Sequence, residues 1–177
     1  MTWHTIRKTI AILAVMTLLV GSASVAVADQ GSAQERPWKV SFNLNYDQPG
    51  THDCALGYTP NHAVGTAKAT HMGLSDAELW DCVNFESGDI ADGVVVYTTA
   101  NGDEYYGAYT GQITGVNPDG SLLYELTGSF EGGTGRFSNA TGTADGSGLA
   151  IAMSATNGVL EGTWAGTITY NASDRSQ

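Results

Sequence analysis

Residues 101–142 read NGDEYYGAYTGQITGVNPDGSLLYELTGSFEGGTGRFSNATG. Two dipeptides in this stretch, Asn101-Gly102 and Asp119-Gly120, tolerate the positive φ angles of tight hairpin turns. Aromatic residues alternate with glycine between the two turns, and a second alternating segment ends in a glycine-rich loop around Arg136. The pattern is typical of a β-meander and predicts an antiparallel β domain. It does not by itself point to a reaction.

The sequence on both sides of this stretch contains further strand-like segments. In residues 38–46 every even-numbered residue is apolar, and this period of two indicates a half-buried strand. Residues 75–78, SDAE, resemble a helix capping box, so we expect a short helical turn there. The other expected strands are 63–72, 79–86, 90–99, 105–114, 121–130, 143–153 and 159–170. Eight strands in sequence order, joined mostly by short turns, favour a sandwich or an up-and-down barrel.

A motif that occurs twice favours the barrel. The pattern G-x-aromatic-x-G-x-Ile-Thr is present at residues 107–114 and 162–169. On a strand, its two glycines share one face with the aromatic residue, Tyr109 or Trp164. Small barrels fill their interiors with alternating small and large side chains, and the glycines would leave room for the rings. We therefore expect an all-β fold, an antiparallel barrel of about eight strands.

The first 28 residues are typical of a secretory signal peptide. Basic Arg7 and Lys8 precede an apolar run at 9–20, and Ala-Val-Ala at 26–28 matches a cleavage site. An uncleaved membrane anchor is the alternative, but the apolar run is short for a spanning helix. We expect a secreted or periplasmic protein that has no membrane association after cleavage. The expected domains are a signal peptide at 1–28, a flexible leader at 29–37, the β-barrel at 38–170 and a flexible tail at 171–177.

The charge balance argues against a nucleic-acid partner. The chain has 18 acidic and 7 basic residues, and removal of the signal peptide with Arg7 and Lys8 leaves a net charge of about −13. Such a chain is repelled by phosphate backbones. The acidic surface is the kind that keeps an exported protein soluble. A chain of this length buries enough surface to fold without a metal, and we expect neither a metal nor a cofactor.

Two cysteines, Cys54 and Cys82, follow the signal segment. A disulfide is the default in an oxidising compartment, and it would stabilise the fold by about 3–4 kcal/mol in the chain-entropy model. The alternative is a catalytic thiol that uses His52 or His71 as its base.

Other chemical motifs are weak. The loop at 132–137, GGTGRF, matches no phosphate-binding pattern, and we expect a structural turn in which Arg136 pairs with a nearby carboxylate or carbonyl. His52, His62 and His71 lie in one region, so a zinc site with Cys54 or Asp53 stays open as an alternative.

The sequence also does not favour a pair of carboxylates in the lumen for acid–base catalysis. Glu125 and Glu161 are the candidates in strands, but each alternates with apolar residues and should face water. The expected lumen is therefore apolar with aromatic side chains, which is typical of a packed core or of an apolar ligand pocket. The lumen candidates are Trp38, Phe42, Tyr46, Tyr109, Tyr124 and Trp164.

The motifs also carry a family resemblance. Residues 100–111, ANGDEYYGAYTG, with 130–142, FEGGTGRFSNATG, and 65–73, GTAKATHMG, resemble a group of secreted, uncharacterised bacterial proteins. The central meander is also similar to the allene oxide cyclase and dirigent-like barrels, which are calycin-like. This resemblance implies an eight-stranded barrel with an apolar cavity and, in the wider superfamily, cofactor-free cyclisation or coupling of small molecules. No residue matches their catalytic polar groups, so no catalytic residue is assigned.

Two functions are consistent with these sequence features. The first is an exported, disulfide-linked barrel that binds a small apolar or aromatic molecule or has a structural role. The second is a cofactor-free isomerase or cyclase that uses the same lumen. An enzyme predicts a buried polar group with a shifted pKa inside the barrel. A lumen smaller than about 300 Å³ would count against both ligand hypotheses.

Overall fold

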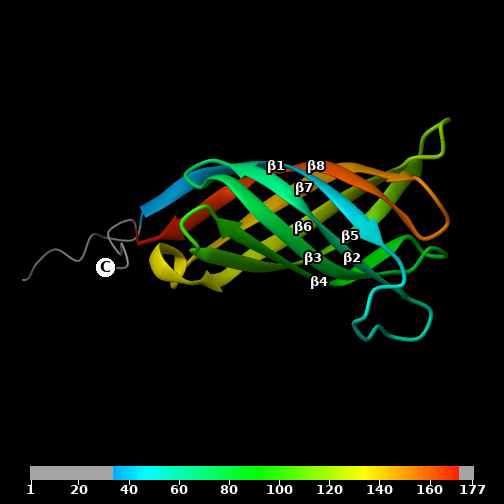
Figure 1. The fold of residues 1–177 in the computed structure, drawn as a ribbon, viewed down its shortest axis with the longest axis horizontal. Helices are drawn as coiled ribbons and strands as arrows, with labels where there is room; N and C mark the ends of the chain where they lie inside the picture. The colour runs from blue at the N-terminus through cyan, green and yellow to red at the C-terminus, as the bar shows by residue number, and fades with distance from the viewer. Residues whose placement is uncertain (1–33, 172–177) are drawn as a thin grey trace, which may run out of the picture. The chain divides into compact units, whose positions relative to one another are not determined.

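The computed structural model describes residues 34–171, which form a closed antiparallel barrel of eight strands (Figure 1). Each strand pairs with its neighbours in sequence, and β8 pairs with β1 to close the sheet. The predicted all-β, eight-stranded antiparallel barrel is thus confirmed. The signal peptide expected at 1–28 lies outside the described residues. The strands are β1 (Gln34–Asp47), β2 (Thr59–Ala69), β3 (Gly73–Val83), β4 (Asp89–Thr99), β5 (Glu104–Val116), β6 (Leu122–Gly133), β7 (Thr141–Ala152) and β8 (Asn157–Tyr170).

Several expectations about local structure differ from the observed strands. β2 and β3 are shifted toward the N-terminus, to Thr59–Ala69 and Gly73–Val83, relative to the expected 63–72 and 79–86. β1 begins at Gln34, four residues before the expected strand, because residues 34–37 pair with the end of β8. The helical turn expected at residues 75–78 is wrong, since these residues belong to β3. Ser75 and Ala77 point into the barrel, and Asp76 pairs with Thr66 on one side and Thr98 on the other. Pairing on both edges overrides the local capping pattern.

A β-bulge in β4 changes which of its residues face the lumen. The pairing of β4 with β5 shifts in register between Ile90 and Gly93, and its pairing with β3 shifts between Ala91 and Val94. Asp92 within the bulge has a positive φ of 53°. Ile90 and, after the bulge, Gly93 and Tyr97 all lie on the buried face. An extra residue of this kind bends a strand and often lies beside a functional site.

Each of the six aromatic lumen candidates lies directly across from a glycine on a neighbouring strand. Trp38, Phe42 and Tyr46 on β1 pair with three glycines of β8, and Trp164 on β8 pairs with Gly146 on β7. In five of the six pairs, all except Trp38–Gly166, the ring occupies the space where a glycine side chain would be, and this is clearest at Gly93, where an added Cβ would come within 2.5 Å of the Tyr109 ring. The remaining pairs are Trp38–Gly166, Phe42–Gly162, Tyr46–Gly158, Tyr109–Gly93 and Tyr124–Gly148.

These pairs correct one detail of the motif at 107–114 and 162–169. Its aromatic residues face the lumen as expected, but the rings of Tyr109 and Trp164 lie over Gly93 and Gly146 of adjacent strands. Of the glycines in the motif, Gly107 and Gly166 face main-chain carbonyls of the next strand instead. The small and large residues therefore alternate across strands rather than along one strand.

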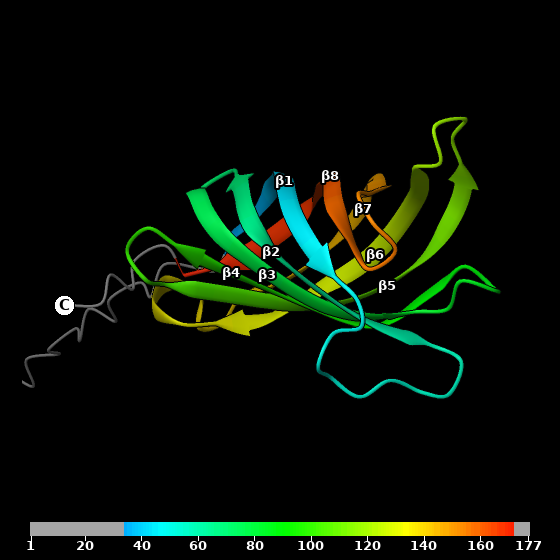
Figure 2. The same ribbon diagram turned by 45° about the vertical axis from the view of Figure 1, so that its right-hand side comes forward.

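The two ends of the barrel are built differently (Figure 1). One end carries the start of β1, the end of β8 and the 3-10 turn Gly135–Phe137, and we call it the plugged end. The other end carries the loops β1–β2, β3–β4, β5–β6 and β7–β8, and we call it the mouth. Figure 2 shows the longest of these loops, between Asp47 and Thr59, extending past the strands at the mouth.

Candidate functional site

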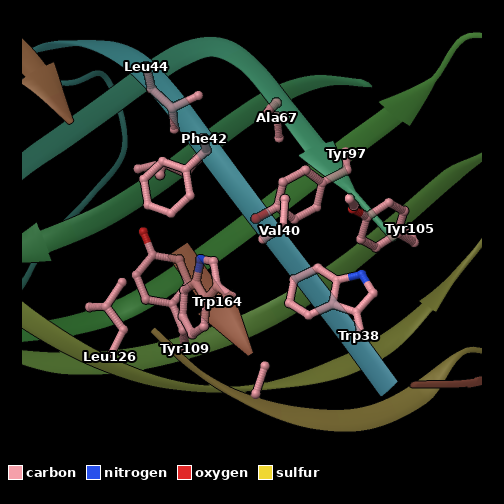
Figure 3. Close-up of a cluster of buried hydrophobic side chains, with 14 of the residues drawn as sticks. Trp38, Val40, Phe42, Leu44, Ala67, Tyr97, Tyr105, Tyr109, Leu126 and Trp164 are labelled. Carbon is pink, nitrogen blue, oxygen red and sulfur yellow. The ribbon is translucent and has the colours of Figure 1, made fainter. Parts of the chain in front are cut away.

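The mouth opens into a cavity of about 80 Å³ inside the barrel. Its walls are mostly aliphatic and aromatic side chains, including Phe42, Leu126 and Trp164. Figure 3 shows Phe42, Tyr109, Trp164 and Leu126 grouped in the lumen, while Tyr97, Tyr105 and Trp38 lie toward the start of β1. The volume is smaller than the ~300 Å³ lower bound for sites that enclose drug-sized ligands. A whole molecule of that size does not fit, which counts against a fully enclosed ligand.

The wall of this cavity includes one buried carboxyl group, Asp81 on β3. The hydroxyl of Tyr109 on β5 donates a hydrogen bond of 2.6 Å to Asp81 Oδ2, reaching across β4 over Gly93. Asp81 Oδ1 is buried and accepts no well-formed hydrogen bond within residues 34–171, although the Asn61 amide lies near enough to the carboxyl to lower its pKa. An unpaired buried acceptor costs about 1–3 kcal/mol, so this oxygen is a place where a donor would be favourable.

The electrostatic environment keeps the Asp81–Tyr109 pair protonated more readily than in water. Burial raises the pKa of the Asp81 carboxyl, while the Tyr109 hydroxyl, the Asn61 amide and His52 partly oppose that rise. Burial and the adjacent Asp81 raise the pKa of Tyr109 well above its usual value. Tyr109 therefore stays a neutral donor, and Asp81 is the group in this pair that can gain or lose a proton.

Two further tyrosines bring hydroxyl groups to the same region. Burial raises the pKa values of Tyr97 and Tyr124, and nearby acidic or phenolic groups add to the rise. Tyr124 donates a hydrogen bond of 3.1 Å to the carbonyl oxygen of Glu161. The cavity thus combines apolar walls with a few neutral donors and one carboxyl, the composition that small-molecule sites usually have.

The loop between β1 and β2 is attached to the barrel beside Asp81. A His52 ring nitrogen, Nε2, lies 2.8 Å from the Asp81 carbonyl oxygen, and Cys54 forms a disulfide with Cys82, the next residue after Asp81. Gln48 contacts Asn61, whose side chain is buried next to the carboxyl. Three attachment points of one loop therefore surround the same acidic residue. The disulfide prediction is confirmed, and the catalytic-thiol alternative is wrong because both sulfurs are bonded to each other.

The six aromatic candidates are all buried, at 2–9% exposure, but they do not form one site. Five of them line the mouth cavity, whereas Trp38 lies at the plugged end beside Tyr105 and Phe130. Glu125 and Glu161 are exposed on the outer face, as the alternation predicted. The lumen side chains of the mouth are Phe42, Tyr46, Tyr109, Tyr124 and Trp164.

Sequence reasoning missed Asp81, the most informative residue of the site. Leu79, Asp81 and Val83 alternate in the sequence and all three are buried, so the parity of β3 carried the signal. The expectation of a helical turn just before this segment obscured it. Applied to β3, the alternation would have placed the Asp81 carboxyl on the inward face, where the neighbouring side chains are apolar.

The other motifs take structural positions. Arg136 Nε lies 3.7 Å from Asp103 Oδ2 at the plugged end, in agreement with the expected pairing to a local carboxylate. The three histidines are not gathered: His62 stacks on Trp80 on the outer surface, and His71 lies in the turn between β2 and β3 at the plugged end. Only His52 lies near the mouth cysteines.

The similarity of this chain to known proteins is low. No family model matches this chain, and no curated protein matches it either. A solved structure of a pterocarpan synthase dirigent protein is similar over 82% of this chain and 91% of that protein, with 13% identity and a TM-score of 0.44. No helix of residues 34–171 has the length and apolarity to cross a bilayer.

Proposed function

We propose that the mouth of this barrel binds the end of a small apolar or aromatic molecule that carries a hydrogen-bond donor. The observation that supports this proposal is the buried Asp81 oxygen without a well-formed hydrogen bond, in a cavity whose walls are mostly apolar. Because the cavity holds about 80 Å³ and is open at the mouth, the rest of the molecule would remain between the loops. The confirmed disulfide supports a role outside the cytoplasm.

A purely structural role is less well supported. A barrel that serves only as a scaffold gains nothing from a buried, partly unpaired carboxyl, since replacing such a group with an apolar one of similar size is neutral or stabilising. Asp81 lies in a mostly apolar wall together with Tyr109, which positions it through a hydrogen bond.

The experiment is a screen of small aromatic molecules, with and without a hydroxyl group, against the mature protein by NMR. Mass spectrometry identifies any small molecule that co-purifies. We expect hydroxyl-bearing molecules to bind, and we expect Asp81→Asn to weaken that binding about tenfold through loss of a charge-assisted hydrogen bond. Glu161→Gln, which removes an exposed carboxyl on the outer face, is the matched control. Binding that is equal in all three proteins would contradict the proposal.

A second candidate function is cofactor-free isomerisation or cyclisation in the same cavity. The observation that favours it is the raised pKa of Asp81, because a carboxyl with a pKa closer to neutrality exchanges protons with a substrate more effectively. In this mechanism Asp81 gives a proton to one atom of the substrate and takes one from another, so no net proton is consumed.

This candidate is separated from simple binding by hydrogen exchange. A molecule that binds in heavy water would gain deuterium at carbon when the wild-type protein is present. Asp81→Asn would abolish the exchange while binding is still measurable. Binding without any exchange in the wild-type protein leaves the binding function and removes the catalytic one.

A further inference from the structure

The rim of the mouth is acidic. We define the rim as the four mouth loops and the strand ends beside them, residues 47–59, 83–89, 116–122 and 152–157. These positions include no lysine or arginine. None of the rim carboxylates forms an ion pair with another side chain of residues 34–171. The rim carboxylates are Asp47, Asp53, Glu86, Asp89 and Asp119.

The basic side chains lie at the other end of the barrel. Residues 34–171 include four of them, three on the plugged-end half of their strands and one in the 3-10 turn. They are Arg36, Lys39, Lys68 and Arg136. The negative charge at the mouth is therefore not balanced locally. Such a concentration of one sign of charge attracts cations to a cavity and repels anions from it.

Asp81 distinguishes this rim from an ordinary solvated surface. It lies in the wall of the cavity behind the rim and is 6% exposed. Its Oδ2 accepts the hydroxyl proton of Tyr109, whereas its Oδ1 accepts no well-formed hydrogen bond within residues 34–171. An ammonium group at Oδ1 would supply both the donor and the opposite charge that burial makes favourable, and charge-assisted hydrogen bonds are the stronger kind.

Aromatic rings surround the same cavity. Phe42, Tyr109 and Trp164 are grouped there in Figure 3, and all three line the cavity. The faces of aromatic rings attract cations, because the ring quadrupole is negative there. An uncharged donor gains nothing from this attraction. The walls therefore add to the preference of the carboxyl for a positively charged group.

The rim also offers apolar contacts outside the cavity. Leu56, Phe85 and Met153 lie on three different mouth loops, and each is exposed. Phe85 lines the cavity as well, so the apolar surface continues from the lumen onto the rim. A molecule whose charged end enters the cavity can place its apolar part against these side chains.

We propose that the ligand of the mouth is a cationic amphiphile, a primary amine whose ammonium group binds Asp81 Oδ1 and whose aromatic or aliphatic part lies against the rim. This inference rests on the proposed binding function and names the chemical class of its ligand. One N–H of the ammonium group donates to Oδ1, and the other two face the rings and hydroxyl oxygens of the cavity.

The test is an NMR titration of the purified protein with three probes of similar shape, phenethylamine, phenethyl alcohol and phenylacetate. We expect the amine to bind about tenfold more tightly than the alcohol, because a hydrogen bond between charged groups is roughly twice as strong as a neutral one. Phenylacetate should not bind. Added salt should weaken binding of the amine and leave binding of the alcohol unchanged, since salt screens the rim charges.

Two double variants with the same change in net charge test the location. Asp53→Asn with Glu86→Gln removes two rim carboxylates and should weaken binding of the amine about threefold. Glu104→Gln with Glu131→Gln, at the plugged end, should leave it unchanged. Asp81→Asn should remove the preference for the amine over the alcohol, and circular dichroism checks that this variant is folded.

The outcomes separate this inference from the function on which it rests. If the alcohol binds as tightly as the amine, the inference is overturned while the binding function stands. If none of the three probes binds, both fail. The inference is also overturned if the two double variants weaken binding of the amine equally, because the attraction then comes from net charge and not from the mouth.

Discussion

The two ends of the barrel are filled in opposite ways. At the plugged end the ring of Tyr105 stacks on that of Tyr97, with 4.6 Å between the ring centroids, and its centroid lies 5.3 Å from that of Phe137. The cavity that remains there has a volume of about 20 Å³. At the mouth the aromatic side chains leave about 80 Å³ and one buried carboxyl, Asp81. Both ends use aromatic side chains set against cross-strand glycines, so the strands alone do not create the difference.

The loops create it. The 3-10 turn between β6 and β7 places Phe137, which is fully buried, onto Tyr105 and Tyr170 and closes one end. The mouth loops carry exposed side chains instead, including Phe85 and Met153. One end of this barrel is thus packed by the 3-10 turn, and the other keeps a cavity.

Phe137→Ala tests the plug and should have the largest effect. Removal of a fully buried phenyl ring should lower the free energy of unfolding by about 3–5 kcal/mol, measured by urea denaturation. Phe85→Ala at the mouth, where the ring is 55% exposed, is the matched control and should cost about 0.5 kcal/mol. An equal loss in the free energy of unfolding at the two positions would show that the two ends do not differ in their contribution to stability.

Removal of the disulfide tests the mouth. Cys54→Ser together with Cys82→Ser should destabilise the protein by about 3–4 kcal/mol, since the bridge closes a loop with a sequence separation of 28. Amide hydrogen exchange should increase in residues 48–58 and at the end of β3. Protection at the plugged end should remain higher, and a uniform loss of protection would show that the loop does not act locally.

Gly93→Ala tests whether the glycine gives Tyr109 its path to Asp81. The added Cβ would lie 2.5 Å from the Tyr109 ring, so we expect a loss of about 1–3 kcal/mol in urea denaturation. Gly115→Ala, near the mouth end of β5, is the control. Its added Cβ would lie 3.3 Å from a Leu123 methyl group, which can move. If the two variants are equally stable, the Tyr109 ring can move away from an added Cβ, and the glycine is not needed at position 93.

Asp81→Asn should have the smallest effect, on the order of 1 kcal/mol, and it should depend on pH. Burial raises the pKa of Asp81 in the folded state, so the folded protein holds a proton that the unfolded chain has released. The contribution of Asp81 to stability therefore falls as the pH rises from the ordinary aspartate value, about 3.9, through the raised folded value. The variant lacks this dependence.

The measurement is thermal unfolding of both proteins across acidic to neutral pH. The stability of Asp81→Asn relative to the wild type should increase with pH through this window and then level off. A relative stability that does not change with pH would show that Asp81 is ionised as easily in the folded state as in the unfolded one.

Alternation along single strands was readable from the sequence. It predicted that Trp38, Phe42 and Tyr46 face inward and that Glu125 and Glu161 face water, and the burial of each residue agrees. These predictions succeeded because successive side chains of a strand point to opposite faces, whichever strand lies beside it.

Contacts between side chains on different strands could not be predicted from the sequence. Tyr109 reaches Asp81 over an intervening strand, and the bulge at Asp92 shifts the register of that strand. The position of His52 beside the Asp81 carbonyl depends on how a loop returns to the barrel. The helical turn expected at residues 75–78 failed for the same reason, since a local capping pattern carries no information about two pairing neighbours.

The sequence by itself determined the strand content, the inward aromatic residues and the pairing of the only two cysteines in the chain. Tertiary structure alone decided that the sheet closes with β8 on β1, that five of the six lumen rings lie over a glycine and that a buried carboxyl faces one end. The physical reason is the separation along the chain of the residues that interact. Side-chain direction follows from backbone geometry within a few residues, whereas register, closure and the position of loops depend on hydrogen bonds and packing between residues far apart in the chain.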